Sequence, residues 1–139
     1  IGVEATFRVI DTPQFVDRMT NFDFDMTVGG AGQSLSPGNE QMEYWHSTRA
    51  DTPGSRNYMG IKDPVVDALV EMVINAPSRE ELIHRTRALD RVLLWGYYSI
   101  PQWHINSWRV AYWDKFGKPQ NQAPYALGEI DTWWVKKAE

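Results

Sequence analysis

The sequence predicts an α/β fold, and three patterns support that prediction. Residues 3–9 and 22–28 each alternate apolar and polar side chains, which is the period of a half-buried strand. Residues 12–20 between them have helical spacing, so we expect a βαβ unit with parallel strands and a right-handed crossover. Two further helical patterns predict a helical hairpin, and more extended segments follow it.

The first strand–helix–strand unit is read directly from side-chain spacing. Thr12 is expected to cap the helix and Pro13 to occupy its first position, with the helix ending near Thr20. The apolar faces of the two predicted strands consist of Val3, Ala5, Phe7 and Val9, and of Phe22, Phe24, Met26 and Val28. Asp23 and Asp25 lie on the polar face, which favours solvated side chains or surface ion pairs.

The helical hairpin has clear start signals. Asp63-Pro64 predicts an N-cap followed by proline at the first helical position, and Ala76-Pro77 ends that helix. Ser78 and Glu81 have the spacing of a capping box, and the second helix is expected to end near Gly96. The predicted buried residues are Val66, Leu69, Val70, Val73, Ile74, Leu82, Ile83, Leu89, Val92 and Leu93. A short helix is expected over 40–45 and a loop over 46–62.

The C-terminal third is rich in aromatic side chains, with six of the seven tryptophans after position 94. Residues 98–105, 108–113 and 132–135 are predicted to be extended. Trp95, Tyr97 and Tyr98 are expected in the core. The later aromatic residues fit two roles, contact with an amphipathic ligand such as a peptide or sugar, and burial in an interface.

Composition excludes several functions. The 139 residues carry 14 Lys and Arg against 18 Asp and Glu, and this net charge of -4 argues against nucleic-acid or anionic-membrane binding. No run approaches about 18 apolar residues, so no membrane insertion is expected. Cysteine is absent, and His46, His84 and His104 form no closely spaced pair, so no metal or other cofactor is predicted.

Residues 29–39 form a glycine-rich loop after the second predicted strand. Ligands of open α/β sheets bind beyond the carboxyl ends of parallel strands, and glycine lets a backbone approach a ligand closely. The predicted ligand-binding residues are therefore Gly30, Ala31, Gly32, Gln33 and Ser34, with Trp103 and His104 as further candidates. An ordinary strand-to-helix connection explains the same loop equally well.

An enzyme is the alternative function. A small α/β hydrolase or nucleotide-binding enzyme would use the loop at 29–36. Gly30-Ala31-Gly32 begins like a dinucleotide fingerprint, but the third glycine is missing, and no Gly-Lys-Ser/Thr sequence occurs. No nucleophile-elbow sequence supports a catalytic serine.

Several segments resemble one known family. They are residues 21–27, the stretch Gly-Gln-Ser-Leu-Ser-Pro-Gly-Asn-Glu at 32–40, Ser55-Arg56-Asn57, residues 60–67 and residues 87–94. Together they are similar to the C-terminal part of periplasmic oligopeptide-binding proteins. These are the family 5 extracellular solute-binding proteins of ABC importers, and the oligopeptide and microcin C branch is most similar.

The resemblance implies a fragment of a two-lobed, type II periplasmic binding protein that is not an enzyme. Residues 1–115 would belong to the second, C-terminal lobe, and residues 116–139 would return toward the first lobe. The family captures peptide-like solutes outside the cytoplasmic membrane and delivers them to an ABC permease. A signal peptide would then lie in a preceding part, and an uncovered apolar face would favour self-association.

The sequence departs from the family at two loop positions. In peptide-binding members, an acidic residue of this loop pairs with the N-terminal amine of the peptide, and Ser34 stands at that position. In the more similar branch, a tryptophan stands where this chain has Ala31.

Overall fold

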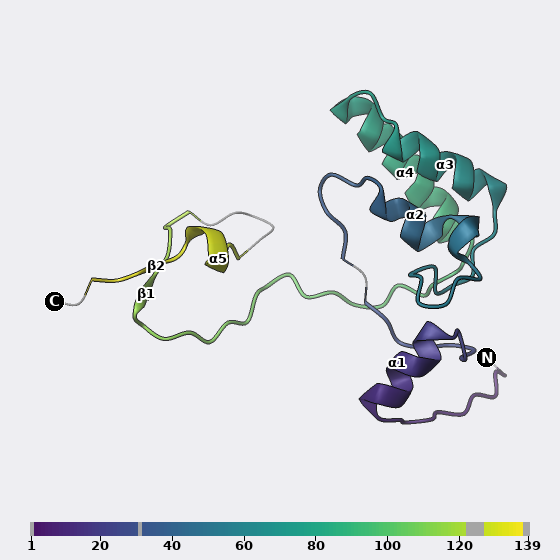
Figure 1. Ribbon diagram of the computed structural model, residues 1–139, viewed down its shortest axis with the longest axis horizontal. Helices are drawn as coiled ribbons and strands as arrows, with labels where there is room; N and C mark the ends of the chain where they lie inside the picture. Colours follow the sequence, from purple (N-terminus) through teal and green to yellow (C-terminus); the bar gives the residue numbers. More distant parts are fainter. Residues whose placement is uncertain (1, 31, 122–126, 138–139) are drawn as a thin grey trace. The chain divides into compact units, whose positions relative to one another are not determined.

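A computed structural model describes residues 2–30, 32–121 and 127–137. The chain divides into two compact units, Ile1–Ile100 and Pro101–Glu139. Helices dominate the first unit, and the sheet found in the described residues has two short strands, both in the second unit (Figure 1). The α/β prediction is therefore confirmed for its helices and not for its larger sheet.

Helix α1 spans Thr12–Thr20, as the sequence predicts, although its cap lies one residue earlier than expected. The Asp11 carboxylate accepts a 2.9 Å hydrogen bond from the backbone N–H of Gln14. A short carboxylate at the N-cap satisfies a donor that the helix itself leaves unpaired. Pro13 follows in the first turn, where its missing N–H costs nothing.

The end of α1 explains part of the next predicted strand. Phe22 has φ 56°, and the N–H of Asp23 donates to the carbonyl of Arg18 at 2.9 Å, which closes the helix with a Schellman turn. Asp23 also forms a 3.1 Å ion pair with Arg18. The predicted surface role of Asp23 is thus confirmed, while Phe22 and Asp23 belong to a helix terminus and not to a strand.

The βαβ prediction is wrong for this structure. Neither residues 3–9 nor residues 22–28 form a strand, and Phe7 and Val9 are 94% and 96% exposed. A strand needs a neighbouring strand to bind its backbone N–H and C=O groups. Alternation shows which side chains share a face, but it does not provide the neighbour.

The helical hairpin is confirmed. Helix α3 spans Pro64–Ile74 and α4 spans Arg79–Trp95. The Asp63 carboxylate accepts from Val65 N at 2.8 Å, and Ser78 Oγ accepts from Glu81 N at 3.2 Å. Helix α2, Glu40–Trp45, and the 3₁₀ turn η1, Ser47–Arg49, precede the hairpin, and α3 contacts both α2 and α4.

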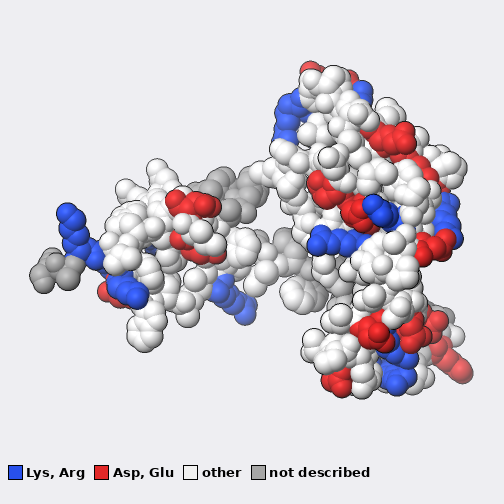
Figure 2. Space-filling model, viewed as in Figure 1, with Lys and Arg blue, Asp and Glu red and all other residues white. Residues whose placement is uncertain are grey.

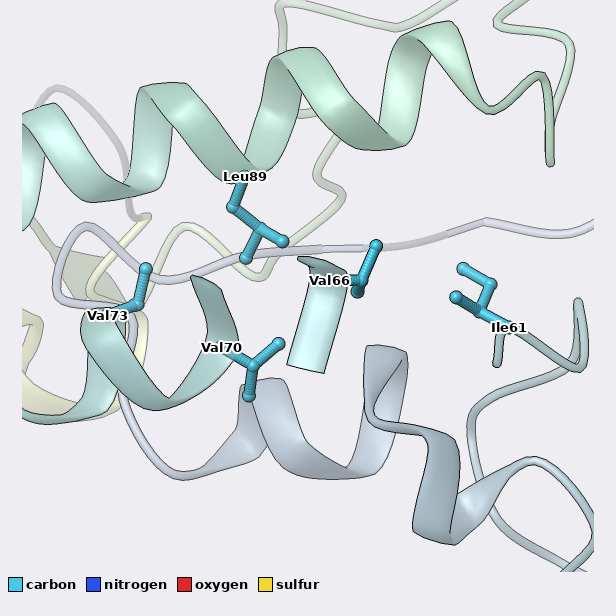
Figure 3. Close-up of a cluster of buried hydrophobic side chains, with 5 residues drawn as sticks. All are labelled: Ile61, Val66, Val70, Val73 and Leu89. Carbon is cyan, nitrogen blue, oxygen red and sulfur yellow. The ribbon is translucent and has the colours of Figure 1, made fainter. Parts of the chain in front are cut away.

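The core of the first unit lies between α3, α4 and the loop before α3. Figure 3 shows its five buried hydrophobic side chains meeting between these elements: Ile61, Val66, Val70, Val73 and Leu89. Burying a side chain of this size stabilises a fold by about 1.5–3 kcal/mol. The predicted stripe of α3 is confirmed. On α4, the spacing predicts that Ile83 is buried, but the structure shows it exposed.

The aromatic residues at the end of α4 and just after it are less buried than the sequence predicts. Trp95 and Tyr97 are exposed, although both were expected in the core. Gly96 is still right-handed, and Tyr97 has φ 52°, so the chain turns away from the helix at Tyr97. Only Tyr98, the third residue of the group, packs against the core.

The second unit contains β1 at Phe116–Gly117, α5 at Glu129–Thr132 and β2 at Trp134–Val135. The strands are antiparallel, with Phe116 opposite Val135. The strand expected at 132–135 is confirmed for its second half. Residues 98–105 and 108–113 are without helix or ladder and largely exposed, and their predicted strands are not formed. The assignment of 1–115 and 116–139 to two lobes stays a prediction.

Candidate ligand-binding loop

The glycine-rich loop joins α1 to α2, and its glycines have no internal reason to be glycine. A Cβ placed on Gly29, Gly30 or Gly32 would meet no atom within 4 Å, and none of the three has a positive φ. Larger residues would therefore fit these positions without strain or overlap in the described structure. Ala31, the remaining predicted residue of this stretch, lies outside the described residues.

The loop is fastened to α2 through Gln33. The side-chain oxygen of Gln33 accepts a 2.9 Å hydrogen bond from Gln41 Nε2, and Gln41 Oε1 accepts one from Trp45 Nε1, also at 2.9 Å. Gln41 is buried, and an indole N–H only donates, so the Gln41 amide has one possible orientation. These two hydrogen bonds direct the Gln33 side-chain oxygen toward Gln41, and among the described residues the Gln33 amide nitrogen donates no hydrogen bond.

A second anchor comes from α4. The Arg79 guanidinium donates to the backbone carbonyl of Leu35 across 44 positions of sequence. Ser34 lies between the two anchors and is exposed, and its hydroxyl oxygen accepts from Ser36 N at 3.2 Å. Within the part of the chain that the structure describes, the Ser34 O–H donates no hydrogen bond.

The carboxylate of Glu40 closes the loop at the start of α2. Gly38 N–H donates to Glu40 Oε1 at 2.9 Å, and this backbone hydrogen bond holds the pKa of Glu40 below its ordinary value of 4.5. The charge also lies at the N-terminal end of a helix, where a negative group is favoured. Glu40 is thus ionised and bound within its own loop, so it is not a free acidic anchor.

The structure places the other two predicted residues in the second unit. Trp103 is 83% exposed and His104 is exposed, and both lie in the extended stretch after residue 100. No hydrogen bond or ion pair is recorded for either side chain among the described residues. Their predicted contact with a ligand stays a prediction.

Sequence reasoning missed a buried polar cluster beside the core. Asn57 has no exposed surface: its Nδ2 donates to the carbonyls of His46 and Ile61 at 3.1 and 3.0 Å. Its Oδ1 accepts from Ile61 N at 2.9 Å. Asn57 thereby fixes the loop between η1 and α3. The Ser55-Arg56-Asn57 motif was visible in the sequence, but only the fold reveals this role.

A serine, a histidine and an aspartate also meet near this loop without forming a catalytic set. Ser47 donates both its backbone N–H and its hydroxyl to Asp67, at 2.8 and 2.5 Å. His46 Nδ1 lies 3.8 Å from the same carboxylate and accepts from Thr48 N at 3.2 Å. The serine proton points to a carboxylate and not to the imidazole, so no nucleophile–base pair exists here.

One shallow hollow of about 440 Å³ was not predicted. It lies where the end of α4 meets the start of α3, and its lining consists of Asp63, Arg91, Val92, Trp95, Gly96 and Tyr98.

Within the described residues, no group of three or more possible ligating side chains is placed to hold a metal ion. In the same residues, no helix combines the length and apolarity that a membrane crossing requires. Lys and Arg lie among Asp and Glu on the face drawn in Figure 2.

The comparisons with known proteins identify the class. No family model matches the chain. It is 50% identical over 138 residues to the uncharacterized protein y4wM of Sinorhizobium fredii, which is 99% of this chain and 21% of that protein. It is 47% identical over 138 residues to the probable peptide-binding protein YejA of Agrobacterium fabrum, again 99% of this chain and 22% of the relative.

A further relative carries a different ligand in its name. The peptidoglycan-binding protein YepA of Agrobacterium fabrum is 37% identical over 139 residues, which is 100% of this chain and 22% of that protein. The chain is thus homologous, over nearly its whole length, to bacterial binding proteins, and neither named activity is that of an enzyme. It corresponds to a segment of a YejA-type binding protein and spans about a fifth of its relatives' length. The family resemblance predicted from the sequence is confirmed at this level.

Proposed function

We propose that the chain is part of the substrate-binding component of an ABC importer and captures peptides or peptide-like solutes in the periplasm for delivery to a permease. The observation that carries this proposal is the 47% identity over 138 residues to a protein named as a probable peptide-binding protein. The relative named for peptidoglycan binding is consistent with this ligand class, because peptidoglycan contains short peptides joined to its glycan strands.

The glycine loop is the proposed ligand contact. Gly30 and Gly32 serve no packing or conformational need within the described residues, which leaves close approach of another backbone as the physical use of glycine there. Gln33 and Ser34, held by the anchors on α2 and α4, offer free donors to peptide carbonyl oxygens. We add Ala31 from its place in the sequence, and Trp103 and His104 as separate aromatic contacts.

The loop at 32–40 offers no free carboxylate to the N-terminal amine of a bound peptide. Ser34 carries no negative charge, and Glu40 is bound to Gly38 N–H within the loop. A free peptide amine would therefore have no carboxylate partner offered by residues 32–40. The proposal is that hydrogen bonds to the peptide backbone dominate, and that blocking the amine leaves binding largely intact.

A chimaera tests this function. The aligned 138-residue segment of the Agrobacterium fabrum YejA is replaced by this chain, and binding is followed by titration calorimetry. Tripeptide pools with free and with acetylated amines are expected to bind alike. Peptidoglycan-derived peptides are the second probe, and glycans and Ni²⁺ are the controls. Binding of glycans or Ni²⁺ without peptides would contradict the proposal.

The alternative enzyme function has no observation in its favour. Among the described residues, the recorded polar contacts of His46 and His84 lie outside the loop at 29–36. The serine hydroxyls of the loop are engaged locally or exposed.

A further inference from the structure

The side-chain amide of Gln33 has one favoured orientation, and its neighbours decide which. An amide can turn over and exchange its oxygen and its NH₂ group, so the partners of each end must be identified. Trp45 settles the first end, because its indole Nε1–H can only donate and lies 2.9 Å from Oε1 of Gln41. The other end of the buried Gln41 amide, Nε2, therefore faces Gln33 and donates to its Oε1 at 2.9 Å.

Glu40 fixes the same orientation of Gln41 from a second side. Gln41 Nε2 also donates to Glu40 Oε1, at 3.2 Å. The hydrogen bond from Gly38 N–H, with a smaller contribution from Gln41, holds the pKa of Glu40 below 4.5, so its carboxylate is ionised at neutral pH and only accepts. Turning the Gln41 amide over would set its oxygen against this carboxylate and its NH₂ group against the indole of Trp45.

The consequence for Gln33 is that its oxygen faces Gln41, and the end of its amide that is not turned toward Gln41 is the NH₂ group. The opposite orientation would bring two NH₂ groups together. Gln33 is exposed, and an NH₂ group only donates, so it matches a carbonyl or carboxylate oxygen of a ligand and not an amine or another N–H. This orientation follows from the contacts that Gln33 makes, and not from a neighbour that it lacks.

We infer that Gln33 selects an acceptor oxygen of the bound peptide, and that Gln41 is the positioning residue that turns the Gln33 NH₂ group toward it. The inference rests on the proposed function and names the chemistry that this site prefers. Two parts of a peptide supply such an oxygen, the backbone carbonyl groups and the C-terminal carboxylate. Tripeptides with free and with amidated C-termini tell them apart, because only a contact with the carboxylate is lost on amidation.

Gln33→Glu in the YejA chimaera tests the donor by titration calorimetry with tripeptide pools. The introduced carboxylate still accepts from Gln41 Nε2, while the donor on the other side becomes an acceptor. Peptide binding at about pH 7.5 is expected to weaken roughly 10-fold or more. At about pH 4.5, close to the ordinary glutamate pKa, many of the introduced groups are protonated and donate again, so binding should return to within about 3-fold of the wild-type chimaera at that pH.

Gln41→Glu tests the positioning role. The introduced carboxylate accepts from Trp45 but cannot donate, so Gln33 should turn its NH₂ group inward and its oxygen outward. Peptide binding is again expected to weaken roughly 10-fold. In a Gln33→Ala background the same substitution should cost little further affinity, since Gln41 acts through Gln33. An equal loss in both backgrounds overturns the positioning role.

Folding of each variant is followed by its melting temperature. The charge introduced by Gln41→Glu lies beside Glu40, and if that variant unfolds, Gln33→Glu alone decides the inference. Gln120→Glu is the matched control, because it makes the same exchange at an exposed glutamine outside the predicted contact residues. Its peptide affinity should equal that of the wild-type chimaera at both pH values.

Two results separate the failure of this inference from the failure of the proposed function. A wild-type chimaera that binds no peptide overturns both. A wild-type chimaera that binds peptide, while Gln33→Glu binds equally well or is equally weakened at both pH values, overturns the role of Gln33 and leaves peptide capture standing.

Discussion

The indole Nε1–H of Trp45 donates a 2.9 Å hydrogen bond to Oε1 of Gln41, one turn earlier on α2. This bond fixes the buried Gln41 amide, whose Nε2 then holds Gln33 of the glycine loop. A tryptophan outside the candidate ligand-binding loop thereby helps to set the position of that loop.

Trp45→Phe is expected to destabilise the fold by about 1–2 kcal/mol, because a buried acceptor loses its donor. Chemical denaturation measures the free energy of unfolding. Tyr44→Phe removes the exposed 2.7 Å hydrogen bond from Arg56 and serves as the control, with an expected change within about 0.5 kcal/mol. Equal losses of unfolding free energy in the two variants would show that the hydrogen bond to Gln41 stabilises the fold no more than an exposed hydrogen bond does.

Asn57→Ala is expected to lower the free energy of unfolding by about 2–4 kcal/mol, since the side chain makes three buried hydrogen bonds. The exposed Asn106→Ala is the control and should be nearly neutral. A loss below about 1 kcal/mol for Asn57→Ala would contradict the assigned role of Asn57 in fixing the loop before α3.

Gly96→Ala tests the packing at the end of α4. Alanine normally favours a right-handed helix end over glycine, but here a Cβ would overlap the ring of Tyr98. The overlap is expected to win and to cost about 1–3 kcal/mol. In a Tyr98→Ser background the same substitution should become neutral or stabilising, which a double-mutant cycle in denaturant measures. An unchanged cost in that background would locate the strain elsewhere.

Glu40 makes stability depend on pH. Folding lowers its pKa below 4.5, because Gly38 N–H binds the charged carboxylate. Its contribution is therefore complete above the unfolded-state pKa and is lost as the pH falls through the lower folded-state pKa. Glu40→Gln should reduce the loss of stability below pH 4.5, as followed by denaturation at several pH values. Glu129→Gln, on the exposed α5, should leave that profile unchanged.

Local signals predicted the helices well. The caps at Asp63 and Ser78 are encoded within a few residues, and the stripe of α3 follows from spacing alone. The strand predictions for residues 3–9 and 22–28 are wrong because a strand needs a neighbouring strand to bind its backbone, and side-chain spacing does not show whether one is present. Trp95 and Tyr97 were misplaced because their burial depends on where the chain turns after Gly96.

The candidate site was predicted only in outline. Glycines at 29–32 indicated the loop, but its anchors are long-range contacts that no local pattern contains. Arg79 reaches Leu35 across 44 positions, and Gln41 is buried although glutamine usually lies at the surface. Nothing in the sequence around Gln41, a polar residue on a short helix, indicates that it binds the glycine loop.

The glycine loop is proposed to contact a bound peptide. Gly32→Val in the YejA chimaera tests it most directly, because this position has open space and no positive φ. We predict that calorimetry shows at least about 10-fold weaker peptide binding while the melting temperature is unchanged. Gly38→Ala, outside the predicted contact residues, should bind peptide normally. Unaltered peptide affinity in Gly32→Val would contradict the account.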